Sequence, residues 1–476
     1  MAELMTKTPK ATLSRRRKPV AGPRGHILLG SAPAMQHDRL GFLLRLTQDY
    51  GDVVHVRFLI WPAYMVNSPD GVKHVLQENY RNYNKDLFTY TVFHPFVGKG
   101  LLTNDGQSWL HQRRLIQPTF HRKHLATFGT LMTGAATAML ERWQDSAGHD
   151  EPLDVAVEMM RLTQSIVGQA LFSVDLSKET DTIGQAITTL SELIADYIYA
   201  PFPPLGVPTV RNRRMQSALR TLDRFVYGLI TQRRQQLVDT ETDDLLSLLL
   251  SARDEETGQG MNDKQLHDEV ITLLVAGHET TANLLTWSWY LLSQHPHVER
   301  RLHAELNDVL GGELPTLERL PELPYTRMVL EETLRLYPPA WIFSRKAIGG
   351  DEIGGYHIPA NSMIWLSPYT THRHPAFWEQ PEVFDPERFT PERSAGRPHY
   401  AYFPFGGGPR QCIGNNFAMM EAQLILATVA QRYRLHLVPG HPVEPQALVT
   451  LRPRYGLAMT VHPISLRAGD KDFAGE

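Results

Sequence analysis

The chain has 476 residues, of which 42% are hydrophobic and 21% charged, with 48 Lys and Arg against 51 Asp and Glu. This apolar content supports a large folded core and excludes a disordered chain. Because there is no basic excess, we expect no nucleic-acid partner. The single Cys excludes an internal disulfide and a Cys-only zinc site, so we expect a soluble protein of a reducing compartment, the cytoplasm.

Residues 1–24 are polar and contain the basic run Arg15-Arg16-Arg17-Lys18. No part of this segment has the length and apolar character of a membrane anchor or a signal peptide. We expect a flexible basic N-terminal tail at 1–24 and one domain at 25–476, since no internal repeat is present. A solvated tail is the usual role of such a run, and peripheral contact with an anionic membrane surface is the alternative.

The sequence predicts strands on both sides of a large helical middle. Strand-like runs occur at Val53–Phe58, at Ala63–Val66 and around Gly354-Gly355, where the last run ends in Ser362–Leu366. Apolar residues at helical spacing fill most of the remaining chain. We therefore expect a mainly α fold with small β-sheets, in the α+β class.

One long helix is predicted to begin near Asn262, which with Gln265 resembles a capping box, and to end at His295 before Pro296. Its roughly 32 residues would span about 48 Å at 1.5 Å per residue. Apolar residues occur on several of its faces. Such a helix must cross the protein interior.

A polar cluster, Ala276-Gly277-His278-Glu279-Thr280-Thr281, lies in the middle of this apolar helix. Gly277 costs ~1 kcal/mol relative to Ala, and burial of Glu279 costs more unless the carboxylate is paired or functional. A packing glycine beside polar side chains that satisfy one another is the alternative to a functional site. The segment is not a zinc-protease motif, because Ala282 stands where the second His is required.

The only cysteine lies in a glycine-rich loop, Phe405-Gly406-Gly407-Gly408-Pro409-Arg410-Gln411-Cys412-Ile413-Gly414, before an apolar helical stretch. The glycines allow the backbone to approach a flat partner closely. Arg410 and the helix N-terminus both favour a thiolate at Cys412. One protein ligand holds an iron only when a macrocycle supplies most of the others, which points to haem. An inert buried cysteine is the alternative, whereas a phosphate-binding loop lacks its Gly-Lys-Ser/Thr ending.

The Cys412 loop resembles the haem-binding signature of the cytochrome P-450 superfamily, Phe405-x-x-Gly408-x-Arg410-x-Cys412-x-Gly414. The polar cluster Ala276-Gly277-x-Glu279-Thr280-Thr281 resembles the oxygen-activation motif of that family. Three further motifs follow the family's order: Trp109-x-x-x-Arg113, Glu332-x-x-Arg335 and Phe384-Asp385-Pro386-Glu387-Arg388-Phe389. The resemblance implies the P-450 fold, a single haem domain with a long central helix, and haem b as the cofactor.

The resemblance also implies the roles of individual residues. Cys412 would be the metal ligand, as a thiolate on the haem iron. Thr280 and Glu279 would be catalytic, with Thr280 holding oxygen and ordering water, its hydroxyl also bonding the Ala276 carbonyl, and Glu279 linking the site to a proton source. The haem-binding set is Trp109, Arg113, Ala276, Arg345, Phe405, Gly406, Arg410, Cys412 and Gly414, in which Trp109 and the three arginines would serve the propionates.

The motif pair Glu332 and Arg335 would lie on one helix face and, by the resemblance, join Arg388 in a buried charge cluster behind the haem. Removal of one member of such a cluster costs about 3 to 5 kcal/mol, so its role would be structural. An exposed helical ion pair is the alternative for a Glu-x-x-Arg match.

The reaction expected from the resemblance is RH + O2 + 2 electrons + 2 protons giving ROH + water. The substrate would be hydrophobic, such as a fatty acid, terpenoid, steroid or polyketide, in a pocket built from Leu87–Phe96, Tyr197–Leu205, Leu273, Ala276 and Ala340–Phe343. Electrons would come from a separate ferredoxin or flavodoxin with its NAD(P)H reductase, since no such module is recognised in the chain, and we expect a monomer. Arg113, Arg114, Arg122 and Lys123 are a candidate docking face for an acidic partner.

Two other functions are compatible with the same haem-thiolate scaffold. A peroxide-driven peroxygenase or an isomerase needs no proton relay, so the intact pair Glu279-Thr280 argues against both. A non-catalytic haem sensor or ligand-binding protein would bind haem and ligand yet consume no NAD(P)H with redox partners.

Overall fold

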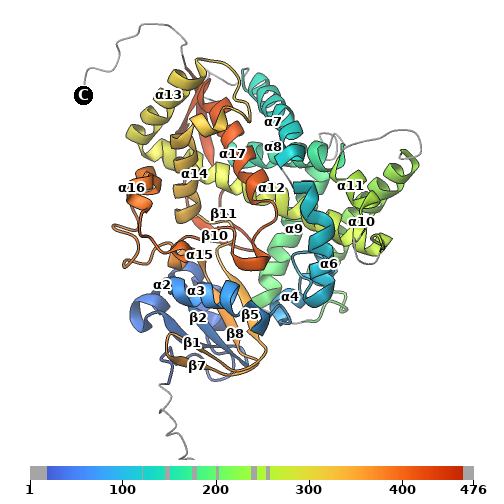
Figure 1. Ribbon diagram of the computed structural model, residues 1–476, viewed down its shortest axis with the longest axis vertical. Helices are drawn as coiled ribbons and strands as arrows, with labels where there is room; N and C mark the ends of the chain where they lie inside the picture. The colour runs from blue at the N-terminus through green and yellow to red at the C-terminus, as the bar shows by residue number, and fades with distance from the viewer. Residues whose placement is uncertain are drawn as a thin grey trace, which may run out of the picture.

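The computed structural model describes residues 19–120, 122–144, 151–173, 180–199, 203–236, 244–253 and 258–464. Its main β-sheet lies at one end of the molecule with the N-terminal part of the chain, and helices from α6 onward fill the rest (Figure 1). Among the described residues, no helix has the length and apolar run that a bilayer crossing requires. The expected mainly α fold with small sheets is confirmed.

The helices account for most of the described chain. The α-helices are α1 (Ala32–His37), α2 (Arg39–Tyr50), α3 (Pro69–Lys73), α4 (Phe88–Thr91), α5 (His94–Val97), α6 (Gly106–Ile116), α7 (Arg122–Trp143), α8 (Val155–Phe172), α9 (Thr180–Tyr199), α10 (Val210–Gln236), α11 (Leu245–Ser251), α12 (Asp263–Gln294), α13 (Pro296–Leu310), α14 (Pro324–Leu336), α15 (Pro368–Thr371), α16 (Pro391–Ser394) and α17 (Asn415–Ala430). Shorter helical turns are η1 (His74–Glu78), η2 (Tyr80–Asn82), η3 (Gln117–Phe120), η4 (Leu320–Glu322), η5 (Pro386–Phe389), η6 (His399–Ala401) and η7 (Gly408–Arg410).

The strands form one larger sheet and three smaller ones. The five-stranded sheet has the order β1-β2-β8-β5-β3, in which β2 and β8 are parallel and the other neighbours antiparallel. Its strands are β1 (Val53–Phe58), β2 (Trp61–Val66), β3 (Tyr83–Asn84), β5 (Phe343–Ala347) and β8 (Met363–Leu366). The smaller sheets are β4 (Leu153–Asp154) with β12 (Ala458–Pro463) and β9 (Tyr433–Leu437), β6 (Asp351–Ile353) with β7 (Tyr356–Ile358), and β10 (Pro445–Ala447) with β11 (Leu451–Pro453).

The strand predictions are confirmed, and the predicted start of the domain is too late. β1, β2 and β8 lie within a residue or two of the predicted runs, and β6 and β7 turn at Gly354-Gly355. Val20 already packs beside β1, and the amide of His55 donates to the carbonyl of Ala21 at 2.8 Å. The packed part of the chain therefore includes residues 20–24, whereas the basic run 15–18 lies outside the described residues.

Helix α12 crosses the centre of the molecule, as its apolar faces predict (Figure 1). It is 32 residues long, and Asn262 caps it by accepting from the amide of Gln265 at 2.9 Å. Helix α8 packs along it, so closely that a Cβ on Gly277 would lie 3.2 Å from a methyl group of Val167. The packing explanation for Gly277 is therefore confirmed, and the neighbouring polar residues need a separate explanation.

The predicted charge cluster on α14 is buried, and its members form ion pairs with one another. Glu332 and Arg335 are both fully buried with Nε to Oε2 at 2.7 Å, and Arg388 Nε lies 3.3 Å from Glu332 Oε1. The five N–H donors of Arg335 all have partners, namely the two Glu332 oxygens and the carbonyls of His372, Pro381 and Val383. This cluster ties α14 to η5 and to the segment before it.

Candidate active site

The Cys412 loop is held in shape by the backbone. The amide of Cys412 donates to the carbonyl of Phe405 at 2.9 Å, which closes a loop that contains η7 and precedes α17. Gly408 has a φ of 63°, and a Cβ there would lie 1.9 Å from the carbonyl oxygen of Leu76 in η1. Gly406 also has positive φ, and no atom lies within 4 Å of a Cβ built there. Only glycine therefore fits at position 408, while position 406 faces open space.

The Cys412 side chain is exposed at this loop. Burial of the surrounding site raises the pKa of the Cys412 thiol, opposed by the Gly414 amide and the charge of Arg113. The Gly414 amide and the charge of Arg113 act in the direction that the sequence predicts, and burial acts against them. Arg113 is the cation that acts on the sulfur, with Nη1 donating to the Gln411 carbonyl at 3.0 Å. A bound iron would add to the effects of these neighbours, because a metal ion deprotonates the thiol that coordinates it.

Arg410 is directed away from the thiol. Its guanidinium lies 4.0 Å from the ring centroid of Trp109 on α6, donates to the Asn104 carbonyl at 3.1 Å, and forms an ion pair with Asp105. Burial lowers the pKa of Arg410 to about 10, with Asp105 acting in the opposite direction. The structure thus brings together two of the residues expected to serve the propionates, Arg410 and Trp109, while Arg113 rather than Arg410 acts on the thiol.

Two further cations gather beside Arg410. Arg345 on β5 is buried, and its Nη1 donates to the Tyr90 hydroxyl at 3.1 Å. Burial, aided by the charges of Arg345 and Arg410, lowers the pKa of Lys85 well below its usual value, and Asp105 opposes this. We call Lys85, Arg345 and Arg410 the cation group. Three cations face one carboxylate, so the group has a net positive charge that an anion would neutralise.

The sequence reasoning missed Lys85 and Asp105. Lys85 follows β3, whose pairing with β5 places Asn84 opposite Lys346. Asp105 caps α6 and binds the backbone amide of Lys85 as well as Arg410. The two segments are 20 residues apart and belong to no common motif, so only the sheet register and the helix start bring them together.

Helix α12 has three positions near its middle that are not buried. Almost every side chain from Leu266 to Leu292 is buried, yet Ala276 is exposed and Gly277 and Thr280 are partly exposed. The Thr280 hydroxyl donates to the Ala276 carbonyl at 2.7 Å, which confirms that predicted hydrogen bond. Ala276 and Thr280, four residues apart on one face of α12, therefore border space that no other side chain fills.

Glu279 points away from that space and is buried. Its Oε1 accepts a hydrogen bond from the Thr450 hydroxyl at 2.6 Å, and its Oε2 accepts one from the Ser191 hydroxyl at 3.1 Å. The Asn283 amide donates to the Thr450 hydroxyl at 3.1 Å. Ser191 and Thr450 were missed because they lie 88 and 171 residues from Glu279 in the sequence.

The remaining predicted haem contacts line the same loop. Phe405 is partly buried against the large core cluster, and Gly414 caps α17 with Phe120 3.9 Å from its virtual Cβ. Three residues of the predicted substrate pocket, Leu273, Tyr197 and Trp341, are buried, and Trp341 Nε1 donates to the Leu448 carbonyl at 3.0 Å.

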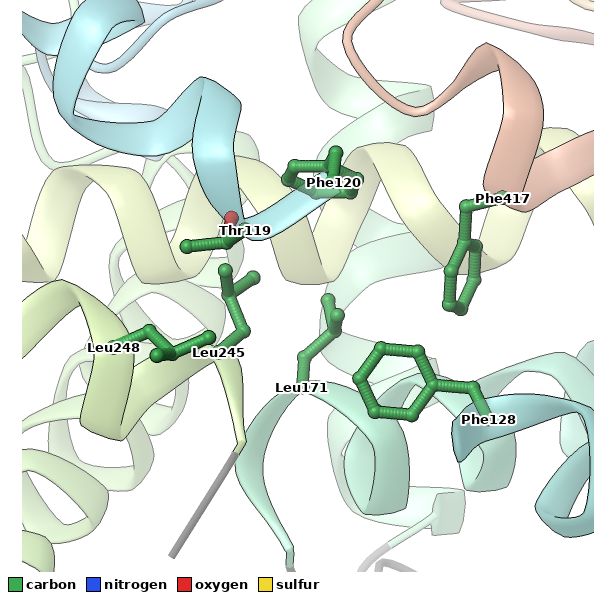
Figure 2. Close-up of a pocket in the computed structure, with 7 residues that line it drawn as sticks. All are labelled: Thr119, Phe120, Phe128, Leu171, Leu245, Leu248 and Phe417. Carbon is green, nitrogen blue, oxygen red and sulfur yellow. The ribbon is translucent and has the colours of Figure 1, made fainter. Parts of the chain in front are cut away.

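A small apolar cavity elsewhere does not serve as the substrate site. Figure 2 shows side chains from η3, α7, α8, α11 and α17 around it, namely Thr119, Phe120, Phe128, Leu171, Leu245, Leu248 and Phe417. Its volume of about 10 Å³ is near the minimum that holds one water molecule. We regard it as a packing defect between helices.

Haem needs an axial ligand, an open face beside that ligand, and cations for two propionates. The exposed Cys412, the open position at Gly406 and the cation group supply groups of these three kinds. The donor set therefore fits the cofactor.

The comparisons with known proteins decide the family. The cytochrome P450 family profile matches residues 20–463. Cyclooctatin synthase from Streptomyces melanosporofaciens is 37% identical over 449 residues, covering 94% of this chain and 96% of the relative. The chain belongs to the cytochrome P450 family. It is therefore a haem-containing oxidoreductase that uses O2, a hydrophobic substrate and redox partners.

Further similar proteins agree with this family. Cyclooctat-9-en-7-ol 5-monooxygenase of the same organism is 38% identical, covering 87% of this chain and 88% of the relative. Pentalenene oxygenase from Streptomyces avermitilis is 35% identical, covering 89% and 93%. A crystal structure of the cytochrome P450DA haem domain matches with a TM-score of 0.86 at 26% identity, covering 95% of this chain and 99% of that structure. The P450 fold is thus established.

Proposed function

We propose that this P450 is a monooxygenase that hydroxylates a terpenoid, with Cys412 as the protein ligand of the haem iron. The observation that carries the proposal is the exposed thiol of Cys412, the one cysteine of the chain, in a loop closed by its own amide. Similarity to cyclooctatin synthase, cyclooctat-9-en-7-ol 5-monooxygenase and pentalenene oxygenase supports the substrate class. The proposed folded unit extends from Val20, where packing begins, into the C-terminal region.

The residues of this chain divide the work around the cofactor. Haem, when bound, supplies the redox chemistry that activates O2, and a thiolate ligand favours O–O cleavage. The cation group, with Trp109 and Arg113, holds the propionates through charge-assisted hydrogen bonds. Ala276, Phe405, Gly406 and Gly414 shape the faces that meet the ring.

Thr280 and Glu279 serve proton delivery in this proposal. The Thr280 hydroxyl, anchored on the Ala276 carbonyl, leaves its lone pairs toward the open space, where it accepts from or orients a water molecule. The Glu279 carboxylate lies on the adjoining face of α12 and exchanges protons with the buried hydroxyls around it. Each hydroxylation consumes two protons and two electrons, with one oxygen atom entering the substrate and the other leaving as water.

The proposed electron source is a ferredoxin or flavodoxin with its NAD(P)H reductase. Arg113 and the exposed Arg114 are on α6, and Arg113 contacts the Cys412 loop directly, so an acidic partner docked there would approach the cofactor from the thiolate side. The structure does not describe the side chains of the other two residues of the expected docking face, Arg122 and Lys123. We propose that the protein acts as a cytoplasmic monomer.

Peripheral contact with an anionic membrane is a further proposal about location. Ile27, Leu28 and Ile60 are 84%, 71% and 74% exposed, and the Leu59 amide binds the Leu29 carbonyl at 3.1 Å, so these aliphatic side chains form one patch. The basic run 15–18 precedes this patch in the sequence, and basic charge combined with apolar area favours anionic lipid. Binding to phosphatidylserine vesicles should weaken in Ile60→Ser, and unchanged binding would contradict the proposal.

The absorption spectrum of the reduced protein with carbon monoxide tests the ligand assignment. Wild type should show the strongly red-shifted thiolate band, and Cys412→Ser should lose it because a hydroxyl does not replace the thiolate. Thr286→Ser on α12 is the control and should keep the band. A red-shifted band in Cys412→Ser would contradict the assignment. Oxygenated product from pentalenene with redox partners supports a monooxygenase, whereas haem binding without NAD(P)H consumption would indicate a sensor.

A further inference from the structure

The carboxylate of Glu279 is held by hydroxyl groups from two distant elements. Thr450 donates to one carboxyl oxygen at 2.6 Å and Ser191 donates to the other at 3.1 Å. All three side chains are buried, with exposed fractions of 4% for Glu279, 7% for Thr450 and 1% for Ser191. Each carboxyl oxygen thus has one hydroxyl donor, which fixes the plane of the carboxylate.

Packing and backbone hydrogen bonds hold the two residues that carry these hydroxyl groups. Ser191 lies on α9, which packs against α8 and α10. Thr450 lies in the turn between β10 and β11, where the Leu451 amide donates to the Pro339 carbonyl at 3.0 Å and the Trp287 indole donates to the Leu451 carbonyl at 3.1 Å. Because Trp287 is itself on α12, this turn is attached to the same helix as Glu279.

No lysine or arginine among the described residues forms an ion pair with Glu279. This matters because a guanidinium only donates and keeps its proton at every physiological pH, whereas a hydroxyl both donates and accepts. A carboxylate bound by hydroxyls can therefore be protonated and release its proton without leaving an unpaired cation. The surroundings of Glu279 suit a group that changes its protonation state in each turnover.

An ion pair at the surface covers this network. Glu192 follows Ser191 directly, and Arg452 lies two residues after Thr450; their Oε1 and Nη2 are 2.7 Å apart. The side chains are 44% and 18% exposed, so the pair reaches solvent. It joins α9 to β11 next to both hydroxyl groups and places a solvent-exposed carboxylate one residue from the buried network.

We propose that Ser191 and Thr450 are positioning residues for proton delivery by Glu279. They hold its carboxylate between the surface at Glu192 and Arg452 and the Thr280 side of α12. The proposal rests on the proposed function, because Glu279 serves as the proton donor only in a reaction that consumes protons. In each cycle two protons leave the Glu279 carboxyl group toward Thr280, one after the other, and a proton from solvent replaces each of them.

The test compares Thr450→Val and Ser191→Ala with Thr286→Val. Like Thr450, Thr286 is a buried threonine, and it lies on α12. Its hydroxyl donates to the Ala282 carbonyl at 2.7 Å and contacts no carboxylate. In the purified haem-loaded protein with NADH, a ferredoxin pair and pentalenene, Thr450→Val should turn over about tenfold more slowly, as expected for loss of a hydrogen bond to a charged group. The fraction of electrons lost as hydrogen peroxide and the solvent isotope effect should both rise.

A second readout needs no turnover. The infrared carboxylate band of Glu279 is the band that disappears in Glu279→Gln. It should shift in Thr450→Val and in Ser191→Ala, and it should stay in place in Thr286→Val. Thr450→Ser, which keeps the hydroxyl, should restore both the band position and the low peroxide yield.

The outcomes separate this proposal from the proposed function. If Thr450→Val and Ser191→Ala matched Thr286→Val in peroxide yield and isotope effect, the positioning role would be wrong even with the thiolate band intact. If the infrared band did not move, the hydrogen bonds themselves would be refuted. If Cys412→Ser kept the thiolate band, the ligand assignment would fail while the infrared result remained interpretable on its own.

Discussion

Two groups of buried charges differ in how they are compensated. On α14, Arg335 has a partner for each N–H, and Glu332 lies between two arginines. In the cation group, Asp105 forms an ion pair with Arg410 and acts on Lys85, while Arg345 binds the Tyr90 hydroxyl. Both groups have more cations than carboxylates, so the count of charges does not distinguish them. We call the α14 cluster complete because each N–H of its central arginine has a partner in the protein, which stabilises the fold, whereas the cation group can receive an anion.

The largest expected effect is on the complete cluster. Arg335→Ala leaves Glu332 buried beside empty space, so the free energy of unfolding should fall by about 3 to 5 kcal/mol. Urea denaturation measures this loss. Arg327→Ala on the same helix is the control, because its ion pair with Glu331 is 63% exposed at the arginine and should contribute less than about 1 kcal/mol. Equal losses in the two variants would contradict the distinction.

A smaller effect is expected when the cation group loses one member. Arg410→Ala removes a charge that the propionates need, so haem should dissociate about tenfold faster or more, as measured by its transfer to apomyoglobin. Arg114→Ala, which removes an exposed arginine of α6, should leave the rate unchanged. If Arg410→Ala lowered unfolding stability as far as Arg335→Ala yet kept its haem, Arg410 would belong with the complete cluster.

The smallest effect is a pH dependence that comes from Lys85. Its pKa in the folded protein is lowered by burial and by Arg345 and Arg410, so the unfolded chain binds a proton more readily than the folded one. Stability from this group therefore rises as pH increases from the lowered pKa toward the unfolded value of about 10.4. As the pH rises through this range, the unfolding temperature of wild type should increase relative to that of Lys85→Met. The difference should be clearest before haem is bound. A constant difference would show that the pKa of Lys85 is not lowered in the folded protein.

The sequence predicts those parts of the molecule that depend on local patterns. The ends of α12 follow from the Asn262 cap and from Pro296, and the strand β1 follows from alternation in Val53–Phe58. The same holds for the Cys412 loop, whose glycines and closing hydrogen bond lie within ten residues. Local chemistry decides these features, so one sequence is sufficient.

The features that the sequence did not predict depend on contacts between segments that are far apart in the chain. Lys85 joins Arg345 through the pairing of β3 with β5, and Thr450 reaches Glu279 through a turn 171 residues away. At Cys412 the nearby charges are visible in the sequence, whereas the burial of the site that raises the pKa of the thiol is not. Arg410 was placed by its proximity in sequence to Cys412, although its stacking on Trp109 turns it away.

The single thiol also allows the haem occupancy of a preparation to be measured by cysteine labelling. A reagent that labels accessible cysteines can add one label at most to each chain, and that label falls on Cys412. Once an iron occupies the sulfur, the reagent is excluded. The number of labels per chain therefore equals the fraction of molecules that still lack their cofactor, and intact-mass measurement of a preparation reads its occupancy directly.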